Sequence, residues 1–249
     1  MDASTIPVPS SQASRLLNSF TTFLTLTIHS LLHHRALYPP STFLLTRAYN
    51  LPVPQSRHPA VCAWVNDAIA SVAVRIRKGE VQRVAFVVYA AKKVSERWVF
   101  DVGAFPREGW GVADEGDDEA AQQLGGGGGE EGVNWTDVQE ALRGALRRVA
   151  YAAESRPKLP PGCTFTLAVE LRDDAPAPIG HPQPWIPAQP DLQPPTERSP
   201  ADQGCAIGGE STTPLRSVQA GPLFFECWVE DGKQVSEPSS SGAQSNSTT

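Results

Sequence analysis

The chain has few cysteines and no cysteine pair at the spacing of a metal or redox site. Its four cysteines, Cys62, Cys163, Cys205 and Cys227, are widely separated and form no C-x-x-C motif. This pattern excludes a zinc ribbon and a dense disulfide framework, and it is typical of reduced thiols in the cytosol or nucleus. The N-terminal residues have neither the basic nor the apolar region of a signal peptide, so we expect no secretion.

Long hydrophobic runs and an excess of basic residues are also missing. The apolar stretch 16–37 is interrupted by asparagine, threonine, histidine and arginine, which makes it too polar for a membrane span. The formal net charge of −6 argues against direct sequence-specific nucleic-acid binding, which normally needs a basic face. The acidic residues are concentrated, since residues 107–137 hold nine acidic side chains and one basic one.

The motifs of common catalytic sites are absent from the sequence, including G-x-S-x-G and H-E-x-x-H. The five glycines 125–129 have no following G-K-[ST] and have acidic neighbours that would repel phosphate, so they indicate a flexible insert. His29, His33 and His34 include a pair at the i,i+4 spacing that could bind a metal, and Asp173 and Asp174 could form a metal-binding or acid/base pair. A helix end and a solvated turn are the simpler interpretations. We predict no enzyme, no metal and no cofactor.

Hydrophobic periodicity predicts an α+β domain with one core. Apolar residues at helical spacing predict three helices, over about 15–37, 58–78 and 136–154, the last beginning with a capping box at Thr136. Strands are predicted over 42–49, 81–89, 97–102 and 222–229, with an extended connector at 50–54. Residues 1–14, 107–133 and 233–249 are predicted to be a disordered tail, an acidic Gly-rich insert and a second tail.

A further strand is predicted after the Pro160-Pro161-Gly162 turn. Proline removes a backbone donor and glycine supplies a positive φ, so these three residues cannot continue a helix. From 164 to 171 the chain alternates, with apolar side chains on one face and mainly polar ones on the other; the apolar ones are Phe165, Leu167, Val169 and Leu171. The alternation predicts a strand buried on one face.

The C-terminal part then leaves this pattern and returns to it. Residues 173–217 are rich in proline and contain an isolated Trp185, which has no periodic apolar neighbours to build a core around it. The last predicted strand places Glu226 and Trp228 on one face and apolar residues on the other. A lone Trp in such a tract more often anchors the segment or contacts a ligand. We therefore expect the segment to fold over a bound partner.

Several sequence blocks, taken in order, resemble the HORMA-domain family. They are Tyr38-Pro39, Tyr49–Pro54, His58-Pro59, Val84–Val88, Pro160–Thr166, Pro184–Ile186 and Pro214-Leu215. The Tyr-Pro and P-P-G-C-T-F-T blocks are similar to the branch of the family that serves translesion DNA polymerase zeta as a non-catalytic accessory subunit. The resemblance implies a HORMA domain over residues 15–232, with three helices packed on a mainly antiparallel β-sheet. It also implies a C-terminal safety belt, 173–232, that closes over a partner's peptide.

The resemblance implies two binding sites for other proteins. Tyr38, Trp64 and Trp185 fall where the family grips a short proline-containing peptide of the catalytic subunit of DNA polymerase zeta. Glu226 and Trp228 fall where it docks the C-terminal domain of the deoxycytidyl-transferring translesion polymerase, which acts as a scaffold.

The resemblance also implies self-association and a cellular role. Arg143, on the third helix, falls where these domains form homodimers or heterodimers. The expected function is a non-catalytic adaptor that bridges the two polymerases during DNA damage bypass, in the nucleus or in both nucleus and cytoplasm. The alternative is a HORMA adaptor for a cell-cycle checkpoint or chromosome-axis client, which only the client peptide would distinguish.

Overall fold

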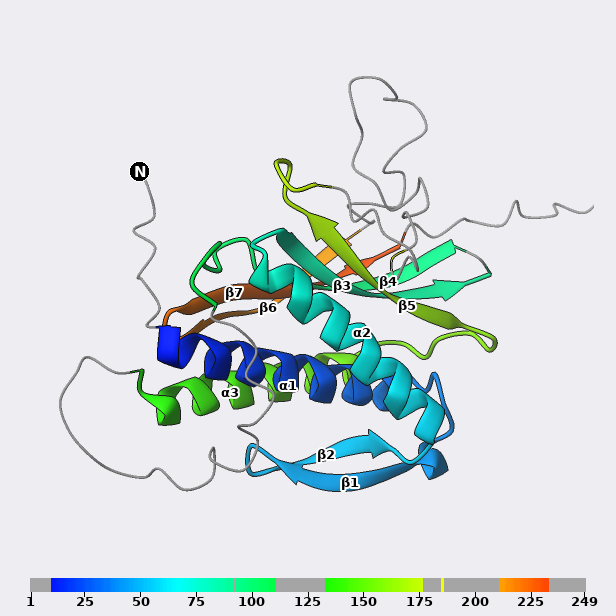
Figure 1. Cartoon of the computed structure of the whole chain (residues 1–249). Helices are drawn as coiled ribbons and strands as arrows, with labels where there is room; N and C mark the ends of the chain where they lie inside the picture. The colour runs from blue at the N-terminus through cyan, green and yellow to red at the C-terminus, as the bar shows by residue number, and fades with distance from the viewer. Residues whose placement is uncertain (1–9, 92, 111–132, 177–184, 186–210, 233–249) are drawn as a thin grey trace, which may run out of the picture.

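The computed structural model describes residues 10–91, 93–110, 133–176, 185 and 211–232 (Figure 1). The predicted tail 233–249 lies outside the described residues. Most of the predicted insert 107–133 and most of the segment between residues 173 and 210 also lie outside them.

The described residues form an α+β domain, with helices between a large sheet and a small one (Figure 1). The helices are α1 (Ser10–His34), α2 (Pro59–Arg77) and α3 (Trp135–Ser155), with a short 3-10 helix η1 (Pro40–Thr42). The five-stranded sheet has the spatial order β5 (Thr164–Leu171), β3 (Val81–Ala90), β4 (Lys93–Asp101), β7 (Leu223–Asp231), β6 (Ser211–Ala220). The small sheet pairs β1 (Phe43–Ala48) with β2 (Leu51–Ser56), and every pair in both sheets is antiparallel.

Helix α1 contacts α2, α3 and β2, because it carries apolar residues on a wide stripe. Its fully buried apolar residues include Leu16, Leu17, Phe20, Phe23, Leu24, Ile28, Leu31 and Leu32. The helix begins at Ser10, five residues before the predicted start at Arg15, and Ala13 is also buried. The tail predicted over residues 1–14 is therefore too long, since an alanine with good helix propensity extends the helix into the core.

Helix α3 begins at Trp135, and its N-cap lies two residues before the predicted cap at Thr136. The side chain of Asn134 accepts hydrogen bonds from the backbone N–H groups of Thr136, at 3.1 Å, and Asp137, at 3.4 Å. Asn134 has an extended backbone, with φ −73° and ψ 98°, and it is thus the N-cap. The prediction that Thr136 caps this helix is wrong, because the asparagine upstream competes for the same free N–H groups.

Among the described residues, helix α2 is long and apolar enough to cross a membrane, judged by its length and composition alone. Its inner face packs into the domain through Val65, Ile69, Val72 and Ile76, all buried. The helix lies against α1 and contacts β3.

Three strands, β2, β4 and β6, differ from the sequence predictions. Strand β4 begins at Lys93, four residues before the predicted start at residue 97. Strand β2 spans Leu51–Ser56 and covers most of the connector predicted over residues 50–54, despite Pro52 and Pro54. The two prolines are two positions apart, so both lack an N–H group on the same side of the strand. That side faces away from β1, and the β1–β2 ladder therefore remains intact. Strand β6 was not predicted at all, since only Leu215, Val218 and Ala220 of its ten residues are buried.

The C-terminal hairpin β6–β7 completes the main core. In β7, Phe225, Cys227 and Val229 are buried, as the alternation predicts. The Phe225 ring packs against two rings of α1, at 5.2 Å from Phe20 and 5.5 Å from Phe23 between centroids. Aromatic pairs at these separations stabilise a core beyond their buried area.

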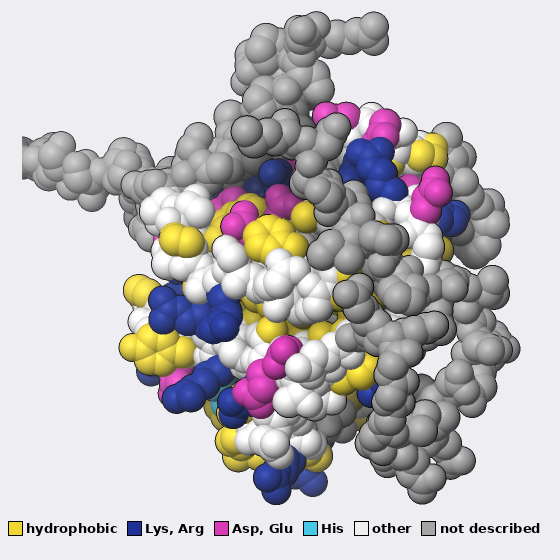
Figure 2. Space-filling view, turned by 90° about the vertical axis from the view of Figure 1, so that its left-hand side faces the viewer, with side chains coloured by type: hydrophobic (Ala, Val, Ile, Leu, Met, Phe, Trp, Pro, Cys, Tyr) yellow, Lys and Arg dark blue, Asp and Glu magenta, His cyan; other side chains and the backbone are white. Residues whose placement is uncertain are grey.

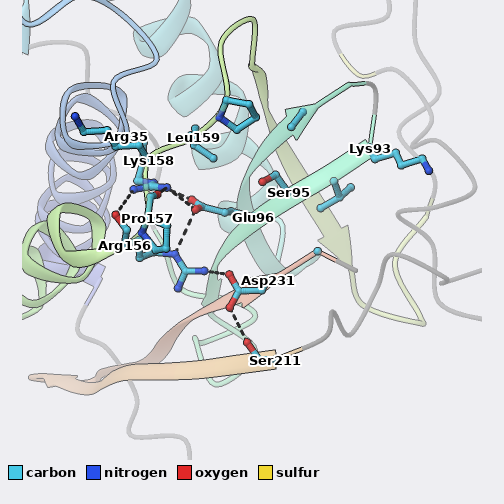
Figure 3. A pocket seen from close by; sticks show the side chains of 14 residues that line it. Arg35, Lys93, Ser95, Glu96, Arg156, Pro157, Lys158, Leu159, Ser211 and Asp231 are labelled. Carbon is cyan, nitrogen blue, oxygen red and sulfur yellow. Dashed lines mark hydrogen bonds and ion pairs between the residues drawn. The ribbon is translucent and has the colours of Figure 1, made fainter. Parts of the chain in front are cut away.

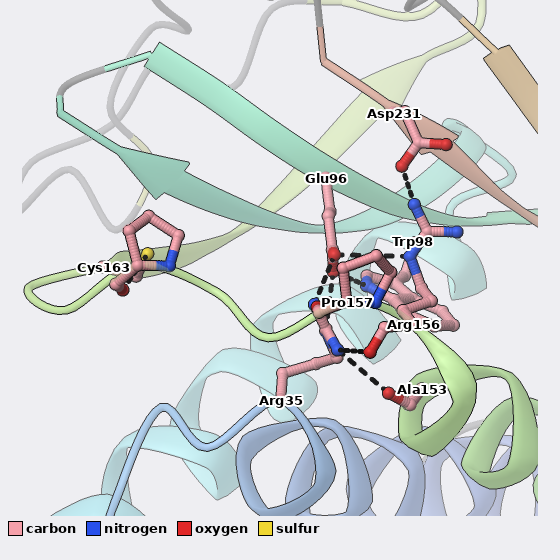
Figure 4. Close-up of polar contacts among 9 residues, drawn as sticks. Arg35, Glu96, Trp98, Ala153, Arg156, Pro157, Cys163 and Asp231 are labelled. Carbon is pink, nitrogen blue, oxygen red and sulfur yellow. Dashed lines mark hydrogen bonds and ion pairs between the residues drawn. The ribbon is translucent and has the colours of Figure 1, made fainter. Parts of the chain in front are cut away.

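A buried ion pair, Arg35–Glu96, joins the end of α1 to β4 (Figure 4). Arg35 donates from Nη2 to Oε1 at 2.7 Å and from Nε to Oε2 at 3.0 Å, and the two side chains are 2% and 6% exposed. Its guanidinium also donates to three carbonyls at the end of α3, those of Ala153, Arg156 and Pro157. A cation at a helix C-terminus faces the negative end of the helix dipole. The pair is therefore buried with its hydrogen-bonding capacity used.

Replacing Arg35 with methionine should strongly destabilise the fold. The Glu96 carboxylate would remain buried without its main partner, and breaking a buried pair in this way costs about 3–5 kcal/mol of unfolding free energy. Urea denaturation monitored by circular dichroism measures this loss. Arg107→Met is the matched control, because Arg107 pairs with Asp174 at 2.5 Å on the exposed surface and its loss should leave the midpoint unchanged. Equal midpoints for the two variants would contradict the prediction.

Three histidines lie on the last turns of α1, beside β1 and β2. His29 is buried, and its Nδ1 accepts a hydrogen bond from the backbone N–H of Ser56 at 3.4 Å. The His33 ring lies 5.1 Å from the ring of Phe43 and 4.8 Å from that of His34. Burial lowers the pKa of all three; the charge of His33 lowers the pKa of His34 further, and Glu154 opposes the shift at His33 and His34. No group of three possible metal ligands occurs within the described part of the chain.

These histidines should make the fold less stable as the pH falls from about 7 to 5. Their folded-state pKa values lie below the ordinary 6.5, so the unfolded chain takes up protons first as the pH falls through that value. The contribution of the histidines to the free energy of unfolding is thus present above about pH 6.5 and lost below it. His29→Gln keeps an acceptor for Ser56 but cannot be protonated, and it should reduce the slope of unfolding free energy against pH. An unchanged slope would show that His29 plays no part.

Candidate functional site

The C-terminal part of the chain leaves the sheet at one edge and re-enters it at the other. Strand β5 is one edge, and the chain next joins the sheet as β6 and β7, beyond β4. Leu171 and Ser211 therefore lie on strands at opposite edges of the sheet, with β3, β4 and β7 between them. Residues 173–210, the first part of the safety belt predicted over 173–232, connect the two edges.

Strand β5 has a free edge among the described residues. It pairs with β3 on one side, and no described strand lies on its other side. Thr164 is exposed and the other residues of β5 are only half-buried, whereas most of β3 is buried. Phe165, Leu167 and Val169 pack against the main core from the inner face but keep part of their surface exposed. An edge strand with apolar residues and unpaired backbone groups is a template for an added strand.

Four aromatic rings form a cluster at the start of β5, which we call the aromatic cluster. Phe165 is at its centre, with ring centroids 6.0 Å from Tyr38, 5.3 Å from Trp64 and 5.5 Å from Phe86. Tyr38 follows α1, Trp64 lies on α2, and Phe86 lies on β3. Trp64 is 39% exposed and Tyr38 is half-buried, so the cluster reaches the surface. Two of the predicted peptide-binding residues are thus brought together.

Phe165 is the member of this cluster that the sequence reasoning missed as a site residue. The alternation in 164–171 identified Phe165 as inward-facing, and the structure agrees. Its role as the contact between Tyr38 and Trp64 depends on where α1 and α2 lie over the sheet, which alternation within one strand does not encode.

Trp185, the third predicted peptide-binding residue, is half-buried and packs against the main core. Its neighbours in the sequence lie outside the described residues. A tryptophan that packs on the core from the segment between β5 and β6 agrees with an anchoring role.

Glu226 and Trp228 lie together on the outer face of β7, as predicted from alternation. Trp228 packs beside a second small apolar cluster on this face, formed by Ala85, Val87, Val94 and Val99. Its indole Nε1 donates to Glu230 at 2.7 Å, and the guanidinium of Arg83 lies 5.8 Å from its ring. Glu226 is exposed and accepts a hydrogen bond from Ser217 at 2.9 Å. This surface is separate from the aromatic cluster.

Arg143 lies on α3 and is 41% exposed, where it forms an ion pair with Glu140 of the same helix. On the face shown in Figure 2, Lys and Arg side chains form separate groups with hydrophobic and acidic side chains between them. Asp174, one member of the candidate pair Asp173 and Asp174, pairs with Arg107, and this hydrogen bond lowers the pKa of its carboxyl group. Asp174 is therefore one partner of an exposed surface ion pair.

Comparison with known proteins places this geometry in context. The family model of the HORMA domain matches residues 17–209 of this chain. A relative from Schizosaccharomyces pombe, named DNA polymerase zeta processivity subunit, is 28% identical over 218 residues, covering 87% of this chain and 92% of that protein. The mitotic spindle assembly checkpoint protein MAD2A of Dictyostelium discoideum is 26% identical, over 68% of this chain and 74% of that protein. In the crystal structure of the mitotic checkpoint complex, one chain superposes with a TM-score of 0.62 at 19% identity, covering 88% of this chain and 96% of that one.

Proposed function

This chain belongs to the HORMA domain family, and we propose that it captures a short proline-containing peptide of the catalytic subunit of DNA polymerase zeta. In this proposal the peptide lies beneath the belt, 173–232, and the domain bridges it to the C-terminal domain of the deoxycytidyl-transferring translesion polymerase. The chain is a HORMA adaptor, and we propose that it has no catalytic activity of its own and acts in the nucleus. The name of the Schizosaccharomyces pombe relative supports the choice of polymerase zeta.

The observation that carries this proposal is the path of the chain around the sheet. Because the chain leaves at β5 and returns beyond β4, the connecting segment starts beside the free edge of β5. A peptide added as a strand along that edge would gain main-chain hydrogen bonds from β5, the mode known as β-augmentation. A segment that passes over such a peptide slows its escape, so affinity is expressed mainly in the dissociation rate.

The aromatic cluster supports a proline-containing client. Proline-rich segments dock in grooves lined by aromatic side chains, because their extended conformation is preformed and costs little entropy to bind. Tyr38, Trp64 and Phe165 supply such a lining at the start of β5, and Trp64 remains accessible. The client's proline would therefore lie near Phe165.

The outer face of β7 supports the bridging role. Trp228 presents an aromatic ring between charged neighbours, which is the composition of an interface anchor with a polar rim. Because this face is on a different surface from the aromatic cluster, one domain can hold both partners at once. The proposed dimer contact through Arg143 uses a third element, α3.

A checkpoint client is the second candidate, and one observation favours it. The Dictyostelium discoideum relative is named as a checkpoint protein and is nearly as similar in identity as the polymerase relative. The two candidates share the capture mechanism and differ in the peptide.

The deciding experiment exposes the full-length chain to labelled proline-containing peptides tiled along the polymerase zeta catalytic subunit. Checkpoint and chromosome-axis peptides are assayed in parallel. We expect one short polymerase peptide to be captured, with dissociation over minutes or longer and an association rate that levels off at high peptide concentration. That plateau arises because opening of the belt limits capture.

Capture of only a checkpoint or axis peptide would reassign the client and leave the adaptor mechanism in place. Fast binding and fast release of every peptide, with the fold intact by circular dichroism, would contradict capture beneath a belt.

Trp185→Ala should weaken capture by about 2 kcal/mol or more, which is the range for a buried aromatic anchor and corresponds to roughly a 30-fold change in Kd. Fluorescence anisotropy with the captured peptide measures the change. Tyr151→Ala is the matched control, since Tyr151 is an aromatic residue that is 63% exposed on α3. A folded Trp185→Ala chain that binds as tightly as the parent would remove Trp185 from the site.

A further inference from the structure

Both ends of the C-terminal hairpin meet at one point of the domain. Ser211, the first residue of β6, pairs across the hairpin with Asp231, the last residue of β7. The Ser211 hydroxyl donates to Oδ2 of Asp231 at 2.6 Å. The chain therefore enters and leaves the hairpin at the same place, beside the start of β4 (Figure 3).

A relay of charged side chains connects this point to the buried core. Arg156, just after α3, forms an ion pair with Oδ1 of Asp231 and donates from Nε to Oε1 of Glu96 at 3.3 Å (Figure 4). Glu96 is held in turn by Arg35, and it accepts a third donor, Nε1 of Trp98, at 3.1 Å. We call the series Ser211, Asp231, Arg156 and Glu96 the relay. It joins the hairpin to the residues just after α3 and to β4 through polar side chains, in addition to the apolar contacts of Phe225 with α1.

The relay becomes progressively more exposed toward the hairpin. Glu96 is 6% exposed, Arg156 is 14% exposed and Asp231 is 36% exposed. A pocket of about 610 Å³ opens beside these residues, lined also by Lys158 and Lys93, so that solvent and ions reach the outer pair (Figure 3). Arg35 and Glu96, the inner pair, also line this pocket but are almost fully buried, whereas Arg156 and Asp231, the outer pair, are more exposed.

The backbone at this end of the hairpin has little room to adjust. Gly232 donates its N–H to the carbonyl of Ser95 at 2.7 Å, and a Cβ on Gly232 would lie 1.8 Å from the carbonyl oxygen of Val94. The close approach holds only while β7 is docked on β4. When β7 separates from β4 at this end, the Gly232–Ser95 hydrogen bond and the outer ion pair therefore both break.

We propose that the Arg156–Asp231 ion pair is a latch that sets how long a captured peptide is retained. This inference rests on the proposed peptide capture, because release of a peptide beneath the belt requires the returning end of the belt to leave β4. The latch stabilises the docked hairpin and touches no part of the aromatic cluster. Its loss should raise the dissociation rate and leave the initial contact with peptide unchanged.

The test uses full-length Asp231→Asn, which keeps the shape of the side chain and removes its charge. The probe is the tightest-binding labelled proline-containing peptide of the tiled set, and its release is followed after adding excess unlabelled peptide. We expect release to be roughly tenfold faster, the change produced by losing one hydrogen bond between charged groups. Release from the parent should also accelerate at high salt, because the latch is partly exposed, and Asp231→Asn should lose most of that salt dependence.

Two further variants separate a latch from a general loss of stability. Ser211→Ala removes the hydroxyl that orients Asp231, and Ser217→Ala removes the equivalent hydroxyl–carboxylate bond elsewhere on the same hairpin. Faster release is expected for Ser211→Ala and parental release for Ser217→Ala. Asp231→Glu, which restores the charge, should recover slow release.

Amide hydrogen exchange without peptide tests the latch independently of capture. In Asp231→Asn, we expect faster exchange in β7 and at Gly232, with β3 unchanged. Parental exchange in β7 or parental peptide release would overturn the latch. If exchange changes as expected but the parent retains no peptide from any source, the latch stands as a feature of the fold and the proposed function fails.

Discussion

The carboxylate of Glu96 is the group on which the arrangement of the domain depends. A carboxylate inside a protein is tolerated only when its oxygens have charged or hydrogen-bonding partners. Here those partners are Arg35 after α1, Trp98 on β4 and Arg156 after α3. Since no element supplies all of them, α1, β4 and the end of α3 must be placed together, and the C-terminal hairpin is added to this group through Arg156.

The two edge strands of the large sheet differ in how much of their surface is covered by other described elements. At one edge, β6 contacts α3 and contributes Leu215 and Val218 to the core. At the other, β5 keeps its apolar side chains only half-covered and gathers the aromatic cluster at its start. Among the described residues no strand pairs with this edge of β5, and an edge of this kind invites unwanted pairing unless something specific occupies it. A peptide-capturing adaptor has a use for such an edge, and the HORMA family relationship agrees with that reading.

Local patterns predict those parts of the fold that local physics determines. Strand β5 was predicted from 164 to 171, because a Pro-Pro-Gly turn and strict alternation leave no other regular structure. Strand β6 was missed because its exposed residues carry no alternation, and its conformation comes from pairing with β7. The meeting of Tyr38 and Trp64 at Phe165, and of Arg35 with Glu96 61 positions later, depends on packing between elements. Such contacts leave no signal in either segment alone. The family resemblance identified Tyr38 and Trp64 as site residues, but it did not predict that Phe165 joins them.

The response of the hairpin to a pulling force follows from the fact that its two ends lie together. A pulling force on the chain beyond Gly232 acts at the end of β7 where the strand meets Glu96. Because β7 is antiparallel to β4, a force directed away from the sheet peels the strand from this end, and the hydrogen bonds break one after another. The same force applied along the strands would load all of them together. The domain therefore separates more easily under a force directed away from the sheet than under one along the strands. The first contacts to fail are the Gly232–Ser95 hydrogen bond and the Arg156–Asp231 ion pair.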